Sequence, residues 1–117
     1  MTNRKTWVRD ALISLLLAAG YMLIFAYNNT LLGAAIGSDN AMYLTMGTAL
    51  AKGYAPYTEI FDHKGPLLFL LQLLPQAVSG GYSLTAVFIQ ETLVLFACLM
   101  MMRAIAKELD VCPWAAQ

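Results

Sequence analysis

Two long runs of apolar residues dominate the chain, and more polar segments precede, separate and follow them. The first run covers 11–36 and is interrupted only by three polar residues at 28–30, while the second covers 82–106. A helix needs about 20 residues to cross a hydrocarbon layer of about 30 Å. The pattern therefore predicts an all-α membrane protein with transmembrane helices at 11–36 and 82–106. A cleavable signal peptide is disfavoured, because its apolar region spans only about 7–15 residues.

The segment between the two runs, 37–81, is more polar and predicts a loop with short juxtamembrane helices. Ser38 suits the cap of a helix at 39–52, because its side chain can accept a hydrogen bond from a free backbone N–H. Gly53 suits the position after the helix end, where the backbone turns left-handed. Pro56 disfavours helix at the residue before it and predicts a turn.

A second short helix is predicted at 66–79, which is apolar almost throughout. At about 1.5 Å per residue its fourteen residues reach only about 21 Å, too short to span a bilayer. Pro75 is expected to kink or end it. The segment is therefore interpreted as an interfacial or re-entrant helix.

The basic residues suggest an orientation. They gather before the first run and at the end of the second, and basic residues near span ends favour the cytoplasm. Two spans place both clusters inside, with 107–117 cytoplasmic and the loop 37–81 outside. A third span at 66–79 would move the second cluster outside. The cationic residues concerned are Arg4, Lys5, Arg9, Arg103 and Lys107.

Composition agrees with a membrane protein and excludes one class of partner. Of 117 residues, 60% are hydrophobic and 12% are charged, against about 25% charged in soluble domains. So short a chain cannot bury that much apolar surface in its own core, so the excess must face lipid or other protein. Seven basic and seven acidic residues without a basic run exclude a nucleic-acid partner. Cys98 and Cys112 do not form a disulfide pattern.

Asp39 is the first candidate for chemistry, at the start of the predicted helix 39–52. An acidic residue there can simply complement the helix dipole. Tyr43 follows four residues later and shares the same helix face. The pair could line a pocket, or Tyr43 could belong to the aromatic belt at the membrane surface.

The densest polar cluster precedes the helix 66–79 and consists of Asp62, His63, Lys64 and Gly65. Gly65 is the expected N-cap, because proline is favoured at the following position. A helix N-terminus attracts anions, and Lys64 adds a full positive charge. A phosphate suits this place; alternatively Lys64 is a snorkelling side chain with Asp62 as its surface partner. His63 is the single histidine, so it is a poor metal site and more simply a loop residue.

These residues resemble a known family. The stretch GSDNAMYLTMGTALAKGYAPYTEIFDHKGPLLFLL resembles the first extracytoplasmic loop of GT-C fold glycosyltransferases, above all bacterial relatives of the dolichyl-phosphate-mannose protein mannosyltransferases. The shared elements are an acidic residue after the first span, a G-x-x-P-Y turn at 53–57, and a Lys-Gly-Pro-Leu element. The similarity covers about 39–71.

The resemblance implies a glycosyltransferase that moves a sugar from a polyprenyl-phosphate carrier to a hydroxyl outside the cytoplasm, in a bacterial inner membrane. It implies Asp39 as the base, and Lys64 with Gly65 as the site of the donor phosphate. A divalent metal is a possible cofactor, with Asp39 as its ligand. Further pocket residues are Tyr43, Tyr57, Asp62 and His63.

The chain departs from that family in length, because its members run to several hundred residues. The 117 residues are therefore expected to be the N-terminal part of one polytopic membrane domain, inactive without the remaining helices. The alternative is a small, non-catalytic protein with two spans that acts through a partner. Glu91 is expected to need polar partners from outside this chain, because charge inside a span is costly.

Overall fold

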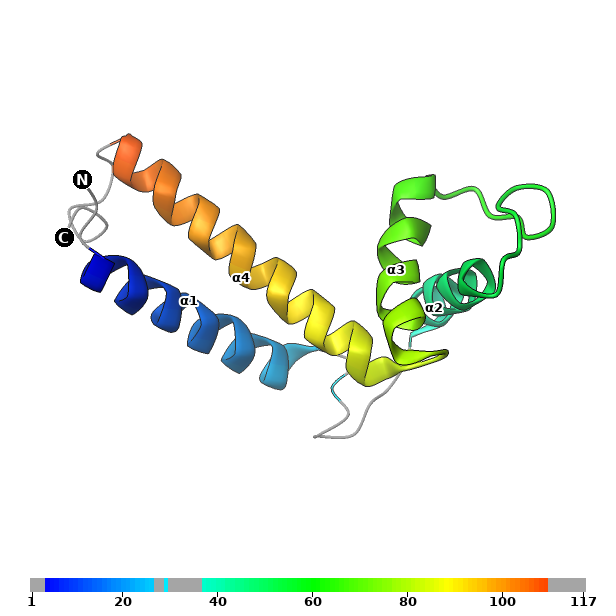
Figure 1. Cartoon of the computed structure of the whole chain (residues 1–117), viewed down its shortest axis with the longest axis horizontal. Coiled ribbons are helices and arrows are strands. Elements are labelled where there is room, and N and C mark those ends of the chain that lie inside the picture. The colour runs from blue at the N-terminus through cyan, green and yellow to red at the C-terminus, as the bar shows by residue number, and fades with distance from the viewer. Residues whose placement is uncertain (1–3, 27–28, 30–36, 110–117) are drawn as a thin grey trace. The chain divides into compact units, whose positions relative to one another are not determined.

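The computed structural model describes residues 4–26, 29 and 37–109, and the elements of this part are four α-helices (Figure 1). They are α1 (Arg4–Phe25), α2 (Ser38–Ala51), α3 (Pro66–Ser79) and α4 (Leu84–Glu108). The all-α prediction is thus confirmed for the described residues. The chain divides into two compact units. The long-helix unit contains α1 and residues 91–108 of α4, and the hairpin unit contains α2, α3 and residues 84–90.

Two helices are long and apolar enough to cross a membrane. They are Lys5–Phe25, with 21 residues, and Leu84–Glu108, with 25 residues. Most of their large apolar side chains are exposed rather than buried in a protein core. Contiguous exposed apolar surface of this kind is rare on soluble monomers and typical of contact with lipid or another protein.

The first long helix differs from its predicted bounds of 11–36. It already begins at Arg4 and ends at Phe25, while Ala26 and Asn29 lie outside helix and 30–36 falls outside the described residues. Apolarity located the apolar part of this helix, but the charged residues before it also favour helix, so the helix starts earlier. The second helix, predicted at 82–106, is displaced by only two residues. The Ser83 hydroxyl accepts a hydrogen bond from the Ala86 N–H at 3.2 Å, which caps it.

A stripe of buried residues runs along α1 at intervals of four, which places its members on one helix face. Ser14 and Ala18 are small, and small residues let helices approach closely in a membrane. Beside the stripe, an apolar groove of about 510 Å³ is lined from both α1 and α4 within the long-helix unit. The stripe consists of Asp10, Ser14, Ala18 and Met22.

In the hairpin unit, α2 and α3 come into close contact at Gly47. A Cβ atom at this position would lie 2.6 Å from the carbonyl oxygen of Gln72, which is shorter than real side chains tolerate. Leu44 and Met46 on α2 and Phe69 on α3 are buried. Glycine is therefore required at 47 for the two backbones to approach.

The short helices have nearly their predicted bounds. Helix α3 matches 66–79, and α2 is displaced by one residue from 39–52. Gly53 follows α2 with φ +90°, and its N–H donates to the Leu50 carbonyl at 2.9 Å, which confirms its turn role. Ser38 was predicted as the cap, which is wrong: Gly37 precedes the helix, and no side chain caps it.

Pro75 does not end α3, which continues to Ser79. A proline has no N–H, so the carbonyl of Leu71, four residues earlier, loses its helical partner. The Gln90 side chain replaces it, because its Nε2 donates to the Leu71 oxygen at 2.9 Å. An amide from the first turns of α4 thus binds the carbonyl that the proline leaves without a helical N–H.

Glu91 is half-buried in α4 and is not without a partner in the structure. The expectation that it must find partners outside this chain therefore loses its support.

Candidate functional site

Segment 53–65, between α2 and α3, is built around Tyr57. Tyr57 has φ +67°, a left-handed conformation that costs a non-glycine residue about 1–3 kcal/mol unless its surroundings fix it. Its N–H donates to the Ile60 carbonyl at 2.7 Å. The Glu59 carboxylate accepts from the Ala55 N–H at 2.6 Å, and the Glu59 N–H donates back to the Ala55 carbonyl at 3.1 Å. Short local hydrogen bonds therefore hold the turn.

The Tyr57 side chain connects this turn to the start of α3. Its hydroxyl donates to the Lys64 carbonyl at 2.7 Å. Its ring centroid lies 6.1 Å from that of Phe69, which is only 1% exposed, and 6.4 Å from that of Phe61. Tyr57 therefore positions the backbone at Lys64, and its hydroxyl is already occupied.

Asp62 fixes the same backbone from the other side. Its Oδ1 accepts the Lys64 N–H at 2.9 Å and lies 3.2 Å from His63 Nδ1. The Asp62 side chain is 12% exposed and that of His63 is 78% exposed. Asp62 thus contacts the Lys64 backbone, and among the described residues no ion pair joins it to the Lys64 ammonium.

Gly65 is the N-cap of α3 and Pro66 is its first residue, as predicted. No side chain caps this end of the helix. The Leu68 N–H donates to the Gly65 carbonyl at 3.3 Å, and Pro66 has none to offer. Lys64 is half-buried and directly precedes this helix end. Its ammonium therefore adds a full positive charge at the N-terminus of α3.

Asp39 lies exposed in the first turn of α2, with Tyr43 half-buried one turn later. Within the described ranges Asp39 makes no side-chain hydrogen bond or ion pair, and none joins it to the cluster 62–65. Among the described residues, no direct contact between the Asp39 carboxylate and the Lys64 ammonium is therefore seen.

Metal-ligating residues do not converge in the part of the chain that is described. No group of three or more His, Cys, Asp or Glu side chains there could hold a metal ion. Asp39, as the possible ligand, would have to share an ion with groups from elsewhere.

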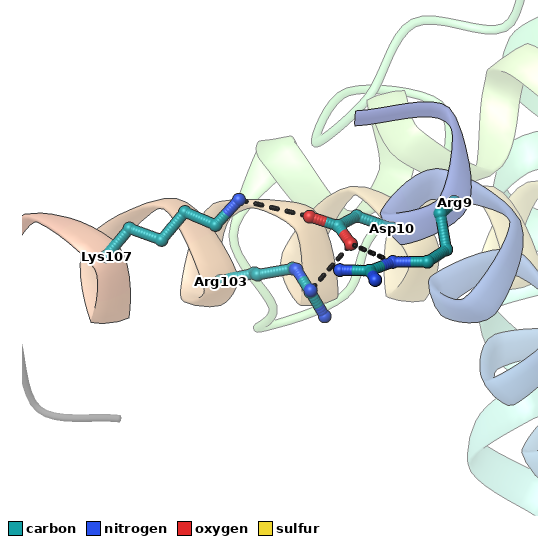
Figure 2. Close-up of polar contacts among 4 residues, drawn as sticks. All are labelled: Arg9, Asp10, Arg103 and Lys107. Carbon is teal, nitrogen blue, oxygen red and sulfur yellow. Dashed lines mark hydrogen bonds and ion pairs between the residues drawn. The ribbon is translucent and has the colours of Figure 1, made fainter. Parts of the chain in front are cut away.

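A second charged cluster, which the sequence analysis did not identify, lies in the long-helix unit (Figure 2). Asp10 is 2% exposed, and its two carboxylate oxygens are 2.6 Å from Arg103 Nη2 and 3.0 Å from Lys107 Nζ. Arg9 Nε lies 3.5 Å from Asp10 Oδ1. Arg103 and Lys107 are four residues apart, on one helix face, and this spacing was the signal in the sequence.

Comparisons with protein-family models, with curated proteins and with solved structures found no match to this chain.

Proposed function

We propose that this chain is the N-terminal part of a membrane glycosyltransferase that moves a sugar from a polyprenyl phosphate to a hydroxyl outside the cytoplasm. The observation that carries the proposal is the way segment 53–66 holds Lys64. Both backbone groups of Lys64 are bound, by Asp62 and Tyr57, directly ahead of the α3 N-terminus. A backbone fixed on both sides suits a residue that must meet a phosphate at a defined place.

The chemistry needs one base and one cation. The acceptor oxygen attacks the anomeric carbon, the bond from that carbon to the phosphate oxygen breaks, and the acceptor proton moves to a carboxylate. Asp39 is the proposed base, because it is exposed and makes no side-chain contact among the described residues. Lys64 is proposed to stabilise the departing phosphate. Since they are not ion-paired with each other, both groups stay available to the substrates.

The other predicted pocket residues divide by their contacts. Tyr57 and Asp62 are proposed as positioning residues, since their polar atoms bind the backbone of Lys64. His63 is exposed and Tyr43 is half-buried, so either can reach a substrate. A divalent metal would use Asp39 together with residues of the remaining helices.

We further propose that α1 and α4 cross a bacterial inner membrane, with both termini cytoplasmic and 37–81 outside. Within the long-helix unit, Asp10 near the start of α1 binds Arg103 and Lys107 near the end of α4. The start of α1 and the end of α4 therefore lie on the same side of the proposed membrane, which supports an even number of crossings. Their positive charge favours the cytoplasm.

The orientation is tested by single cysteines at Ser38 and Thr58, which are both exposed. The background replaces the two natural cysteines, Cys98 and Cys112, by serine. A membrane-impermeant maleimide is expected to label both positions in intact cells. Labelling that requires permeabilised cells would reverse the orientation.

The activity is tested in the longer protein encoded by a reading frame that continues beyond Gln117. Asp39→Asn is expected to abolish sugar transfer at normal expression, and Lys64→Ala to lower kcat/KM for the polyprenyl-phosphate donor. Lys52→Ala removes an exposed cation at the end of α2 and is the matched control. Normal transfer by Asp39→Asn would remove the base, and an unchanged donor KM and kcat in Lys64→Ala would remove the phosphate site.

A second candidate, a two-span protein that acts through a partner, is favoured by one observation. Helix α3 exposes an apolar face, on which Val78 is 87% exposed. A natural stop codon after Gln117 and a stable product of this length would favour this candidate, whereas further apolar runs downstream would favour the enzyme. The face consists of Leu67, Leu70, Leu74 and Val78.

A further inference from the structure

The ends of α1 and α4 that Asp10 joins contain more cationic than acidic side chains. Residues 4–10 and 103–108 contain five cationic and two acidic side chains. The Asp10 carboxylate forms ion pairs with Arg9, Arg103 and Lys107, so three cations surround one anion (Figure 2). This end of the long-helix unit therefore has an unbalanced attraction for an anion.

A cavity of about 200 Å³ opens among these charges. Asp10, Arg103 and Lys107 form its polar wall, with Glu108 as the second acidic group. Its apolar wall consists of Trp7, Met100 and Ala104. Pockets for drug-sized molecules begin at about 300 Å³, so this cavity suits a smaller group such as a phosphate with a few attached carbons.

One buried hydrogen-bond donor at this place has no acceptor among the described residues. Arg103 Nε is buried and unpaired among the described residues, although Nη2 of the same guanidinium binds Asp10 at 2.6 Å. Leaving a buried donor unpaired is costly, and a guanidinium matches the oxygens of a phosphate especially well. Asp10 thus orients Arg103 through Nη2, and the guanidinium keeps N–H donors that Asp10 does not bind.

The surroundings indicate which anion fits. Leu12 and Ile13 on α1, and Met101 and Met102 on α4, are exposed directly beside the charged residues. A phospholipid fits this boundary between charged and apolar residues, with its phosphate beside the charged side chains and its acyl chains beside the apolar ones. Trp7 is 56% exposed, and tryptophan is enriched at the headgroup level.

We infer that the ends of α1 and α4 form a binding site for the phosphate of an anionic membrane phospholipid, which Arg103 and Lys107 contact and beside which Trp7 lies. The site uses none of the residues proposed for sugar transfer, but it rests on the proposed membrane crossing of α1 and α4. Basic pockets between membrane helices are a known means of selecting anionic headgroups.

The test uses Trp7 as the reporter. The second tryptophan, Trp114, is replaced by phenylalanine, and the whole chain is reconstituted in phosphatidylcholine bilayers. Trp7 fluorescence is then quenched with brominated phosphatidylglycerol or, separately, with brominated phosphatidylcholine. The expected preference for the anionic lipid is roughly fivefold, the effect of one basic contact at a membrane surface. Equal quenching by the two lipids overturns the proposal.

Two variants test whether the preference for the anionic lipid arises at this cavity. Arg103→Gln is expected to lower it to about one, whereas Lys52→Gln, with the same charge change on the exposed end of α2, leaves it unchanged. Ala104→Leu fills the cavity without touching an ion pair and is expected to abolish the preference with helix content intact. An unchanged preference in both Arg103→Gln and Ala104→Leu overturns the site. Displacement by inorganic phosphate at constant ionic strength would identify a site for soluble anions and overturn the lipid assignment.

Discussion

The long-helix unit and the hairpin unit hold their helices together by different means. In the long-helix unit, one buried carboxylate binds cations of the other helix, and most large apolar side chains are exposed. In the hairpin unit, two backbones meet at Gly47, and Phe69 and Gln76 are almost completely buried. Both units leave apolar surface for their surroundings to cover, but the first joins its helices through buried charge and the second through close backbone packing.

The largest expected effect comes from removing the carboxylate of the long-helix unit. Asp10→Asn should lower the free energy of unfolding in micelles by about 2–4 kcal/mol, because it leaves Arg103 and Lys107 without their counter-charge. Glu108→Gln makes the same charge change at the same end on an exposed residue, and should have little effect. Denaturant titration compares the two. Equal effects would mean that the buried ion pairs do not hold this unit together.

The hairpin unit is broken by adding one methyl group. Gly47→Ala should destabilise the α2–α3 contact by about 1–3 kcal/mol, because its Cβ would meet the Gln72 carbonyl. Gly20→Ala is the matched control in α1, where a Cβ meets nothing within 4 Å. That change should be neutral or stabilise the helix by up to about 1 kcal/mol. Hydrogen exchange in α2 and α3 separates the two outcomes, and a stable Gly47→Ala protein would refute the close contact.

A double substitution tests whether the Gln90 amide replaces the N–H that Pro75 lacks. Gln90→Ala should cost about 0.5–1.5 kcal/mol, because it removes the donor to the Leu71 carbonyl. In a Pro75→Ala background the helix supplies its own N–H, so the same change should cost almost nothing. Additive effects in denaturant titrations of the four proteins would show that Gln90 does not replace the missing donor.

The smallest expected effect is local to the turn. Tyr57→Phe should destabilise segment 53–65 by about 0.5–1 kcal/mol, because only the hydrogen bond to the Lys64 carbonyl is lost. Amide exchange in this segment is expected to accelerate while the long-helix unit is unchanged. Tyr82→Phe, on an exposed tyrosine, is the control. Unaltered exchange would mean that the remaining bonds hold the turn alone.

The sequence predicted what depends on neighbouring residues. Helix α3 was predicted with its observed bounds, and Gly53 and Gly65 occupy the expected positions, because caps and turns are decided within a few residues. The start of α1 was missed, since apolarity reports where lipid can be met and not where helix begins. The catalytic proposal for Asp39 and Lys64 stays a prediction.

The sequence could not reveal contacts between distant residues. Nothing in the local pattern distinguishes Gly47 from Gly20, because only the approach of Gln72 makes a side chain impossible at one of them. Pro75 predicted a kink or an end of the helix, and the amide that binds the Leu71 carbonyl in place of the missing N–H lies on the next helix. Asp10 looked like the end of a polar head until Arg103 and Lys107 were seen beside it.

The partnership of Asp10 with Arg103 has a consequence for biosynthesis, because 93 residues separate them along the chain. At about 5–20 residues per second, the ribosome makes Arg103 roughly 5–20 s after Asp10. The α2–α3 contact, by contrast, is complete within 25 residues of Gly47. In the proposed membrane topology, Asp10 has Arg9 beside it during this delay but lacks Arg103 and Lys107, which favours keeping its carboxylate at the hydrated surface. Complete insertion of α1 would then be linked to the synthesis of α4.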